Sequence, residues 1–69
     1  VLTKPSLITK DRSDNRYRLM QDEVKEYSGE VQNGDIEDVA KELADILYAV
    51  YGTVLEHGLQ DKMEAIFEI

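Results

Sequence analysis

The stretch ELADILYAVYGTVL, Glu42–Leu55, decides the fold of this chain. From Leu43 to Leu55 it carries one charge, Asp45, among aliphatic and aromatic side chains. Apolar residues recur at helical spacing on more than one side of this segment, which indicates a helix surrounded by other helices. Because the burial of an unpaired carboxylate is costly, Asp45 needs a partner that makes its charge tolerable.

The residues that precede this stretch predict an antiparallel helical hairpin. A first helix is expected to begin near Ser13 or Asp14, either of which can cap it, and to end near Gln32 before an Asn-Gly pair. A second helix is expected from Ile36 to about residue 56, with Asp35 as its N-cap. Because the connection is short, the two helices should be antiparallel neighbours.

The two ends of the chain complete the prediction of an all-α fold class. Residues 1–12 hold the single proline and show no sustained periodicity, so they are predicted to form an extended arm. Residues 60–69 predict a third helix with Met63, Ile66 and Phe67 facing inward. The chain has no initial methionine and stops within a helical pattern, so we expect one domain that lacks a C-terminal helix of a longer protein.

The length of the chain predicts self-association. A domain of 69 residues hides only about 60% of the surface that its unfolded chain exposes, which leaves it marginally stable. The sequence has no cysteine, so neither disulfide bonds nor a thiolate zinc site can add stability. We therefore expect a homodimer or homotetramer that completes the core.

Charge and hydropathy exclude two classes of partner. Fifteen acidic and eight basic side chains give a net charge of -7, which disfavours binding to nucleic acid. The longest apolar run is too short for a membrane span and contains Asp45, and the N-terminus does not resemble a signal peptide. These features predict a soluble, cytoplasmic protein.

Acidic residues at helical spacing form the candidate site. Glu23 and Glu26 are three residues apart in the first predicted helix, as are Glu42 and Asp45 in the second. This spacing places each pair on one side of its helix, so the pairs can face each other across the hairpin. Four converging carboxylates repel one another unless a cation compensates them. Oxygen ligands without histidine or thiolate favour Mg²⁺, with Mn²⁺ as a substitute.

The bland interpretation of these acids is a solvated helix surface. It explains Glu23 and Glu26 well and Glu42 adequately, but it fits Asp45 poorly because the neighbours of Asp45 are apolar. The motifs DEVKE, residues 22–26, and ELAD, residues 42–45, resemble those of the all-α nucleoside triphosphate pyrophosphohydrolases, the MazG-like group that includes phosphoribosyl-ATP pyrophosphohydrolase-like proteins. The resemblance covers about two-thirds of the chain, including the NGD turn and the segment DILYAVYGT.

The resemblance implies a site and a reaction. Glu23, Glu26, Glu42 and Asp45 would hold magnesium, and Asp22 would activate water. Where this chain has Asp22 the family usually has glutamate, which is longer by one methylene. The implied reaction is hydrolysis of a nucleoside triphosphate between the α- and β-phosphates to give a nucleoside monophosphate and pyrophosphate. The base and sugar of the substrate are left open.

Two alternative functions are also consistent with the sequence, and two basic residues are candidates for binding the substrate. The first alternative is a non-catalytic acidic helical dimerisation or interaction module, and the second is a family member that keeps the fold without turnover. Lys10 and Arg16 precede the acids and are candidate substrate-binding residues, because basic side chains bind phosphate groups. Balancing nearby carboxylates is the alternative role for both.

Overall fold

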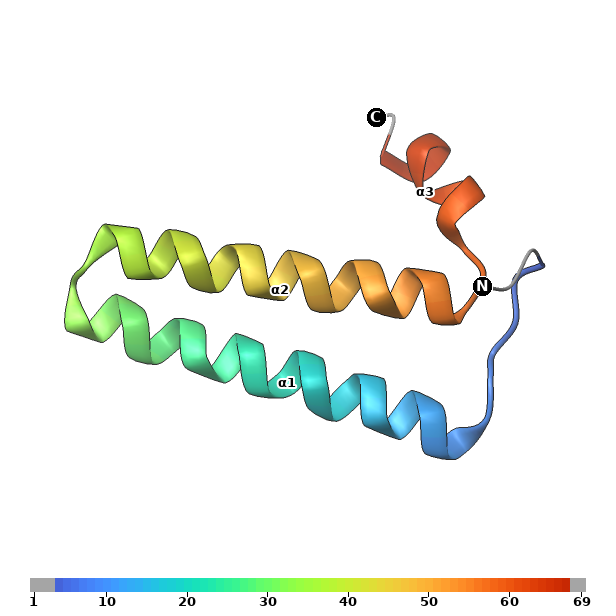
Figure 1. Ribbon diagram of the computed structural model, residues 1–69, viewed down its shortest axis with the longest axis horizontal. Coiled ribbons are helices and arrows are strands. Elements are labelled where there is room, and N and C mark those ends of the chain that lie inside the picture. The colour runs from blue at the N-terminus through green and yellow to red at the C-terminus, as the bar shows by residue number, and fades with distance from the viewer. Residues whose placement is uncertain (1–3, 68–69) are drawn as a thin grey trace.

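Three helices make up the part of the chain that this computed structural model describes, residues 4–67 (Figure 1). They are α1 (Lys10–Asn33), α2 (Ile36–Glu56) and α3 (Gln60–Phe67). α1 and α2 lie side by side in antiparallel orientation, and α3 turns away from the end of α2. The predicted all-α hairpin with a third helix is therefore confirmed.

The first helix begins earlier than predicted. Thr9 is its N-cap, and the Thr9 hydroxyl oxygen accepts a hydrogen bond from the Arg12 amide at 3.3 Å. Ser13 lies within the helix, where its hydroxyl donates to the Lys10 carbonyl oxygen at 3.0 Å. The prediction of an arm over residues 1–12 is thus wrong for residues 10–12. Residues 4–9 are not helical, and residues 1–3 lie outside the described part.

The turn between α1 and α2 follows the predicted chemistry. Gly34 ends α1 in the left-handed region at φ 78°, a conformation that a residue without a Cβ adopts at no steric cost. Asp35 caps α2, since its side chain accepts hydrogen bonds from the amides of Glu37 and Asp38. These caps bring α2 back along α1 and confirm the predicted N-cap and the start of α2 at Ile36.

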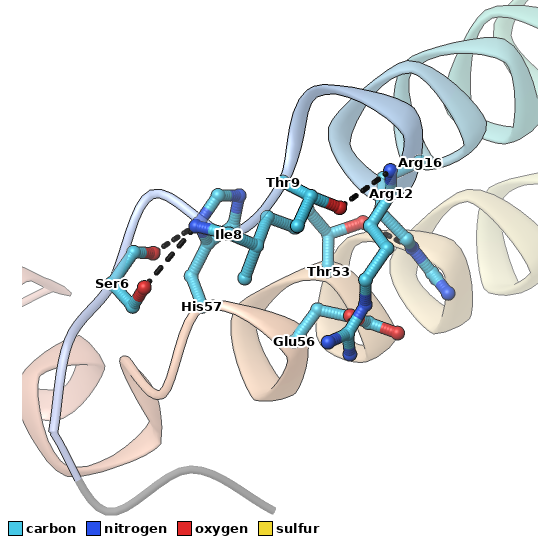
Figure 2. A network of polar contacts seen from close by, with 8 residues as sticks. All are labelled: Ser6, Ile8, Thr9, Arg12, Arg16, Thr53, Glu56 and His57. Atoms are coloured by element: carbon cyan, nitrogen blue, oxygen red, sulfur yellow. Dashed lines mark hydrogen bonds and ion pairs between the residues drawn. The ribbon is translucent and has the colours of Figure 1, made fainter.

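The N-terminal arm is attached to the end of α2 (Figure 2). The Ser6 amide donates to the His57 carbonyl oxygen at 2.9 Å, and the His57 ring nitrogen Nδ1 lies 2.6 Å from the Ser6 carbonyl oxygen. Arg12 forms an ion pair with Glu56 across the same end of the hairpin. Between these contacts Ile8 has φ 58°, a strained conformation for a β-branched residue. The contacts on both sides hold the arm in this conformation.

The two sides of α2 differ in burial. Glu42 and Ala49, seven residues apart, are the buried residues of α2. Leu47, Tyr48 and Tyr51 lie on other sides and are 70%, 81% and 60% exposed. The predicted enclosure of α2 by other helices is therefore not found in the described chain, because α1 alone packs extensively against it.

The third helix adds little burial to the hairpin. Met63 is half-buried, but Ile66 and Phe67 are 64% and 74% exposed, so the prediction that they face inward is wrong for the chain by itself. The end of α3 lies apart from the hairpin (Figure 1), and Met63 and Phe67 line an open groove together with Leu47 and Val54 of α2. No helix within residues 4–67 has both the length and the apolar character that a membrane span requires.

Candidate active site

Three carboxylates meet at the middle of the hairpin. Glu23 and Glu26 come from α1, and Glu42 comes from α2. One carboxylate oxygen from each lies within 4.8 Å of the others. The helical period places Glu23 and Glu26 on the same side of α1, and the antiparallel packing places Glu42 opposite them. We call these three residues the carboxylate cluster.

The environment of Glu42 disfavours its ionised form. Side-chain hydrogen bonding to Glu23, burial, hydrogen bonding to Glu26 and the nearby negative charges raise the pKa of Glu42 from 4.5 to about 8. Glu42 is only 7% exposed, so water cannot screen this repulsion well. Without a compensating cation, the cluster holds a proton at neutral pH.

The cluster has the properties of a site for a divalent cation. The buried atoms Glu23 Oε2 and Glu42 Oε2 have no hydrogen-bond partner within residues 4–67, although buried polar atoms are nearly always paired. A cation would satisfy both oxygens and remove the repulsion. All donors of the cluster are carboxylate oxygens, which suit a hard cation such as Mg²⁺. The residues present therefore fit this ion.

Asp45 does not occupy the buried position that its apolar neighbours suggest. Its side chain is exposed, and it is not part of the carboxylate cluster. The three-residue spacing turns Asp45 about 60° away from Glu42, towards the edge of the helix pair. There it lines an open hollow of about 310 Å³ together with Leu19, Glu23, Tyr48 and Ala49. The prediction of burial is wrong, whereas the role of Asp45 as a fourth ligand stays a prediction.

Asp22 also lies outside the cluster. It precedes Glu23 on α1 and is exposed, because consecutive residues of a helix point about 100° apart. The structure thus places Asp22 beside the site in the sequence but does not join its carboxylate to the other three. Its role as the base that activates water stays a prediction.

The two basic candidates have different surroundings. Lys10 is exposed and forms an ion pair with Asp14 at 2.7 Å, one turn along α1. Arg16 is half-buried between the helices and donates from Nε to the Thr53 hydroxyl at 3.2 Å and from Nη2 to the Ala49 carbonyl oxygen at 3.3 Å. Lys10 therefore balances a carboxylate, whereas Arg16 reaches into the groove of the hairpin.

Sequence reasoning missed two features of this site. It singled out Asp45 as the buried acid, but Glu42 is the buried one. It also overlooked Gly52, beside which the Arg16 guanidinium lies. An isolated glycine within a strongly helical pattern is the signal that points to such a close approach.

One comparison with known proteins gave a match. The family model for phosphoribosyl-ATP pyrophosphohydrolase matches residues 1–69. Neither the search of curated proteins nor the search of solved structures found a match to this chain.

Proposed function

Because the chain belongs to the phosphoribosyl-ATP pyrophosphohydrolase family, we propose that it is a Mg²⁺-dependent nucleoside triphosphate pyrophosphohydrolase. The family supports a hydrolase that acts on phosphoric anhydrides of nucleotides in general. The observation that carries the finer proposal is the carboxylate cluster, in which the buried Glu42 meets Glu23 and Glu26 with two oxygens lacking hydrogen-bond partners in the described chain.

In the proposed site, Mg²⁺ would be held by Glu23, Glu26, Glu42 and Asp45. The ion when bound would offset the charge of the triphosphate and lower the pKa of a bound water. Asp22 is proposed to accept the proton of the attacking water. The water oxygen forms a bond to the α-phosphorus, the bond from that phosphorus to the bridging oxygen breaks, and pyrophosphate leaves with the electron pair.

We further propose that a second copy of the chain completes the fold. Within residues 4–67, Ala49 is the one hydrophobic residue that is buried. Leu43, Leu47 and Val50 lie along another side of α2 and are 46%, 70% and 39% exposed. A hairpin with so little apolar burial is marginal by itself, and covering this side of α2 would supply the missing hydrophobic stabilisation.

The direct test is to identify the products. The full-length protein is incubated with a panel of nucleoside triphosphates, deoxynucleoside triphosphates and phosphoribosyl-ATP, with Mg²⁺ and with excess chelator. The proposal expects a nucleoside monophosphate, or its phosphoribosylated form, and pyrophosphate in equal amounts, and no turnover with chelator. Release of a diphosphate and inorganic phosphate would contradict cleavage between the α- and β-phosphates.

A magnesium titration separates the alternatives if no substrate is turned over. Mg²⁺ that binds the folded cluster raises the melting temperature by mass action. Stabilisation without turnover would indicate a family member that keeps the site but not the activity. If Mg²⁺ gave no stabilisation and no substrate were turned over, a non-catalytic acidic helical dimerisation or interaction module would be the remaining function.

A further inference from the structure

Arg16 differs in burial from every other basic side chain of the protein. All eight lysines and arginines lie within residues 4–67, and Arg16 alone among them is not exposed. Lys10 and Arg12, which lie up to two turns earlier on α1, form ion pairs with Asp14 and Glu56. The Arg16 guanidinium is thus partly shielded from water, whereas the other basic side chains lie at the surface.

The half-buried charge of Arg16 has no acidic partner in the described chain. Its two hydrogen bonds go to neutral oxygens, the Thr53 hydroxyl and the Ala49 carbonyl, and no carboxylate within residues 4–67 lies at ion-pair distance. A cation withdrawn from water without a counter-ion is unfavourable. The planar fork of arginine is suited to carboxylate and phosphate groups, so this side chain is prepared to bind an anion.

Arg16 lies along the same groove as the carboxylate cluster. On α1, residues 16, 19 and 23 recur at helical spacing, and on α2 residues 45, 49 and 52 do the same. Ala49 lines the hollow beside the cluster and also accepts the hydrogen bond from Arg16. Arg16 and Glu23 are seven residues apart, which is about 10 Å along α1. The Arg16 guanidinium thus lies beside the hollow that Glu23 and Asp45 line, and Ala49 joins the two.

We propose that Arg16 binds a phosphate group of the nucleotide beside the hollow that Glu23 and Asp45 line. This proposal rests on the proposed function, in which the cluster acts on the same nucleotide through Mg²⁺. A nucleoside triphosphate carries several charged phosphates, so a site that holds it needs a cation beyond those bound by the cluster. Arg16 positions the substrate and takes no part in proton transfer.

The absence of a side chain at Gly52 leaves the space that the Arg16 guanidinium occupies. A Cβ at position 52 would lie 2.6 Å from Arg16 Nη2, which is far closer than two such atoms approach. Because glycine disfavours a helix interior, its presence near the C-terminal end of α2 is explained by the room it leaves for Arg16. Gly52→Ala would displace the fork of Arg16 and keep its charge, while it favours the helix.

The test compares three substitutions with a matched control in the full-length protein. Arg16→Met removes the charge, Arg16→Lys keeps the charge without the fork, and Gly52→Ala displaces the fork. Arg12→Met is the control, since it removes an exposed charge from the same helix. The measurements are kcat and KM with Mg²⁺, product inhibition by pyrophosphate and by the nucleoside monophosphate, and direct binding of pyrophosphate with Mg²⁺.

The proposal expects a loss of phosphate affinity without a loss of the metal response. Arg16→Met should raise KM roughly ten- to a hundredfold, the range that a hydrogen-bonded charge supplies, while kcat changes much less. Arg16→Lys should recover part of the loss. Gly52→Ala should raise KM although the melting temperature is kept or increased. Inhibition by whichever product Arg16 contacts should weaken in parallel, and Mg²⁺ should stabilise every variant.

Several results would overturn the assignment. An unchanged KM and unchanged inhibition by both products in Arg16→Lys and Gly52→Ala would do so, even if Arg16→Met failed to fold. A change in association state at constant KM would show that a carboxylate of a second copy is the anion. An equal loss in Arg12→Met would show a general effect of charge. If the wild-type protein gave no turnover, the proposed function would fail, and pyrophosphate binding would still decide the role of Arg16.

Discussion

The side of α2 that faces α1 and the side that carries Leu43, Leu47 and Val50 have opposite compositions. The first is nearly covered, yet it holds a buried glutamate, Glu42, and a small residue, Ala49. The second is apolar and largely open. If hydrophobic burial alone determined the packing, the side with Leu43, Leu47 and Val50 would face α1 and the side with Glu42 would face solvent. This difference is what we expect if the contact between α1 and α2 holds the proposed metal site and a second copy covers the apolar side.

This arrangement explains why a short chain can keep a cluster of acids between two helices. Burial of Glu42 opposes folding of the metal-free hairpin, since like charges lie close together. Apolar burial on the other side of α2 and cation binding at the cluster would both offset this cost. Substitutions on one side of α2 leave the other side as it is, so the two contributions can be measured separately.

The largest expected effect follows from removal of a charge at the buried side. Glu42→Gln keeps the size of the side chain but replaces a cation ligand by an amide, so turnover with Mg²⁺ should fall at least about a hundredfold. The stabilisation of the protein by Mg²⁺ should be lost as well. Pyrophosphate release and thermal melting against Mg²⁺ concentration measure the two effects.

Glu64→Gln is the matched control for this variant. Glu64 is exposed on α3, so the same change of charge should leave turnover and the magnesium response unaltered. Wild-type turnover in Glu42→Gln would remove the cluster from the mechanism and would leave the apolar side of α2 as the functional one.

The second prediction concerns the open side of α2. Leu47→Gln should lower the free energy of unfolding of the associated protein by about 1.5 to 3 kcal/mol if a second copy buries this side chain. It should also shift the protein towards monomers at micromolar concentration. Lys41→Gln, an exposed position on another side of α2, should change stability by less than about 0.5 kcal/mol.

Sedimentation and melting at several protein concentrations distinguish the two outcomes. A melting temperature that depends on concentration in the wild type, and not in Leu47→Gln, supports association through this side. An effect of Leu47→Gln as small as that of Lys41→Gln would mean that Leu47 stays exposed in the native protein, as it is in the single chain.

The third prediction compares two alanines of α2. Ala49 is 5% exposed and faces α1, so Ala49→Leu should destabilise the protein by about 1 to 3 kcal/mol through overpacking. Ala44 is exposed, and Ala44→Leu should stay within about 0.5 kcal/mol of the wild type. Denaturant unfolding measures both values. Equal tolerance of the two substitutions would mean that the helices can separate at Ala49 without cost.

Local structure was predicted well from the sequence where it depends on residues that are close together in the chain. Asp35, Gly34 and the helical periodicity define the turn and the course of α2 without any tertiary information. The start of α1 was missed because three residues, Thr9, Ser13 and Asp14, are all able to cap a helix. The choice among them depends on the chain that precedes the helix, where Ser6 pairs with His57, the residue that follows α2 at the same end of the hairpin.

The site was predictable in composition but not in burial. The spacing of the acids and the short connection between the helices predict that Glu23, Glu26 and Glu42 face one another, and the structure brings them together. Which acid of the second pair is buried depends on the rotation of α2 about its own axis. The apolar neighbours of Asp45 suggested one rotation, but packing against α1 selects another, in which Glu42 points inward. Periodicity identifies the faces of a helix, but it does not show which face packs against which neighbouring helix.

The last prediction concerns the pH dependence of the metal-free protein. The pKa of Glu42 is about 8 in the folded state and 4.5 when the neighbours are absent. Between these values the folded protein keeps a proton that the unfolded chain has released, so this group makes stability fall as pH rises from about 4.5 to 8. Mg²⁺ binds the ionised cluster, so its stabilising effect should grow over the same interval. Melting curves with chelator across this range should show a steeper decline for wild type and Glu64→Gln than for Glu42→Gln. An identical decline in all three proteins would show that another group holds the proton. The ionisation of Glu42 would then not destabilise the side of α2 that faces α1.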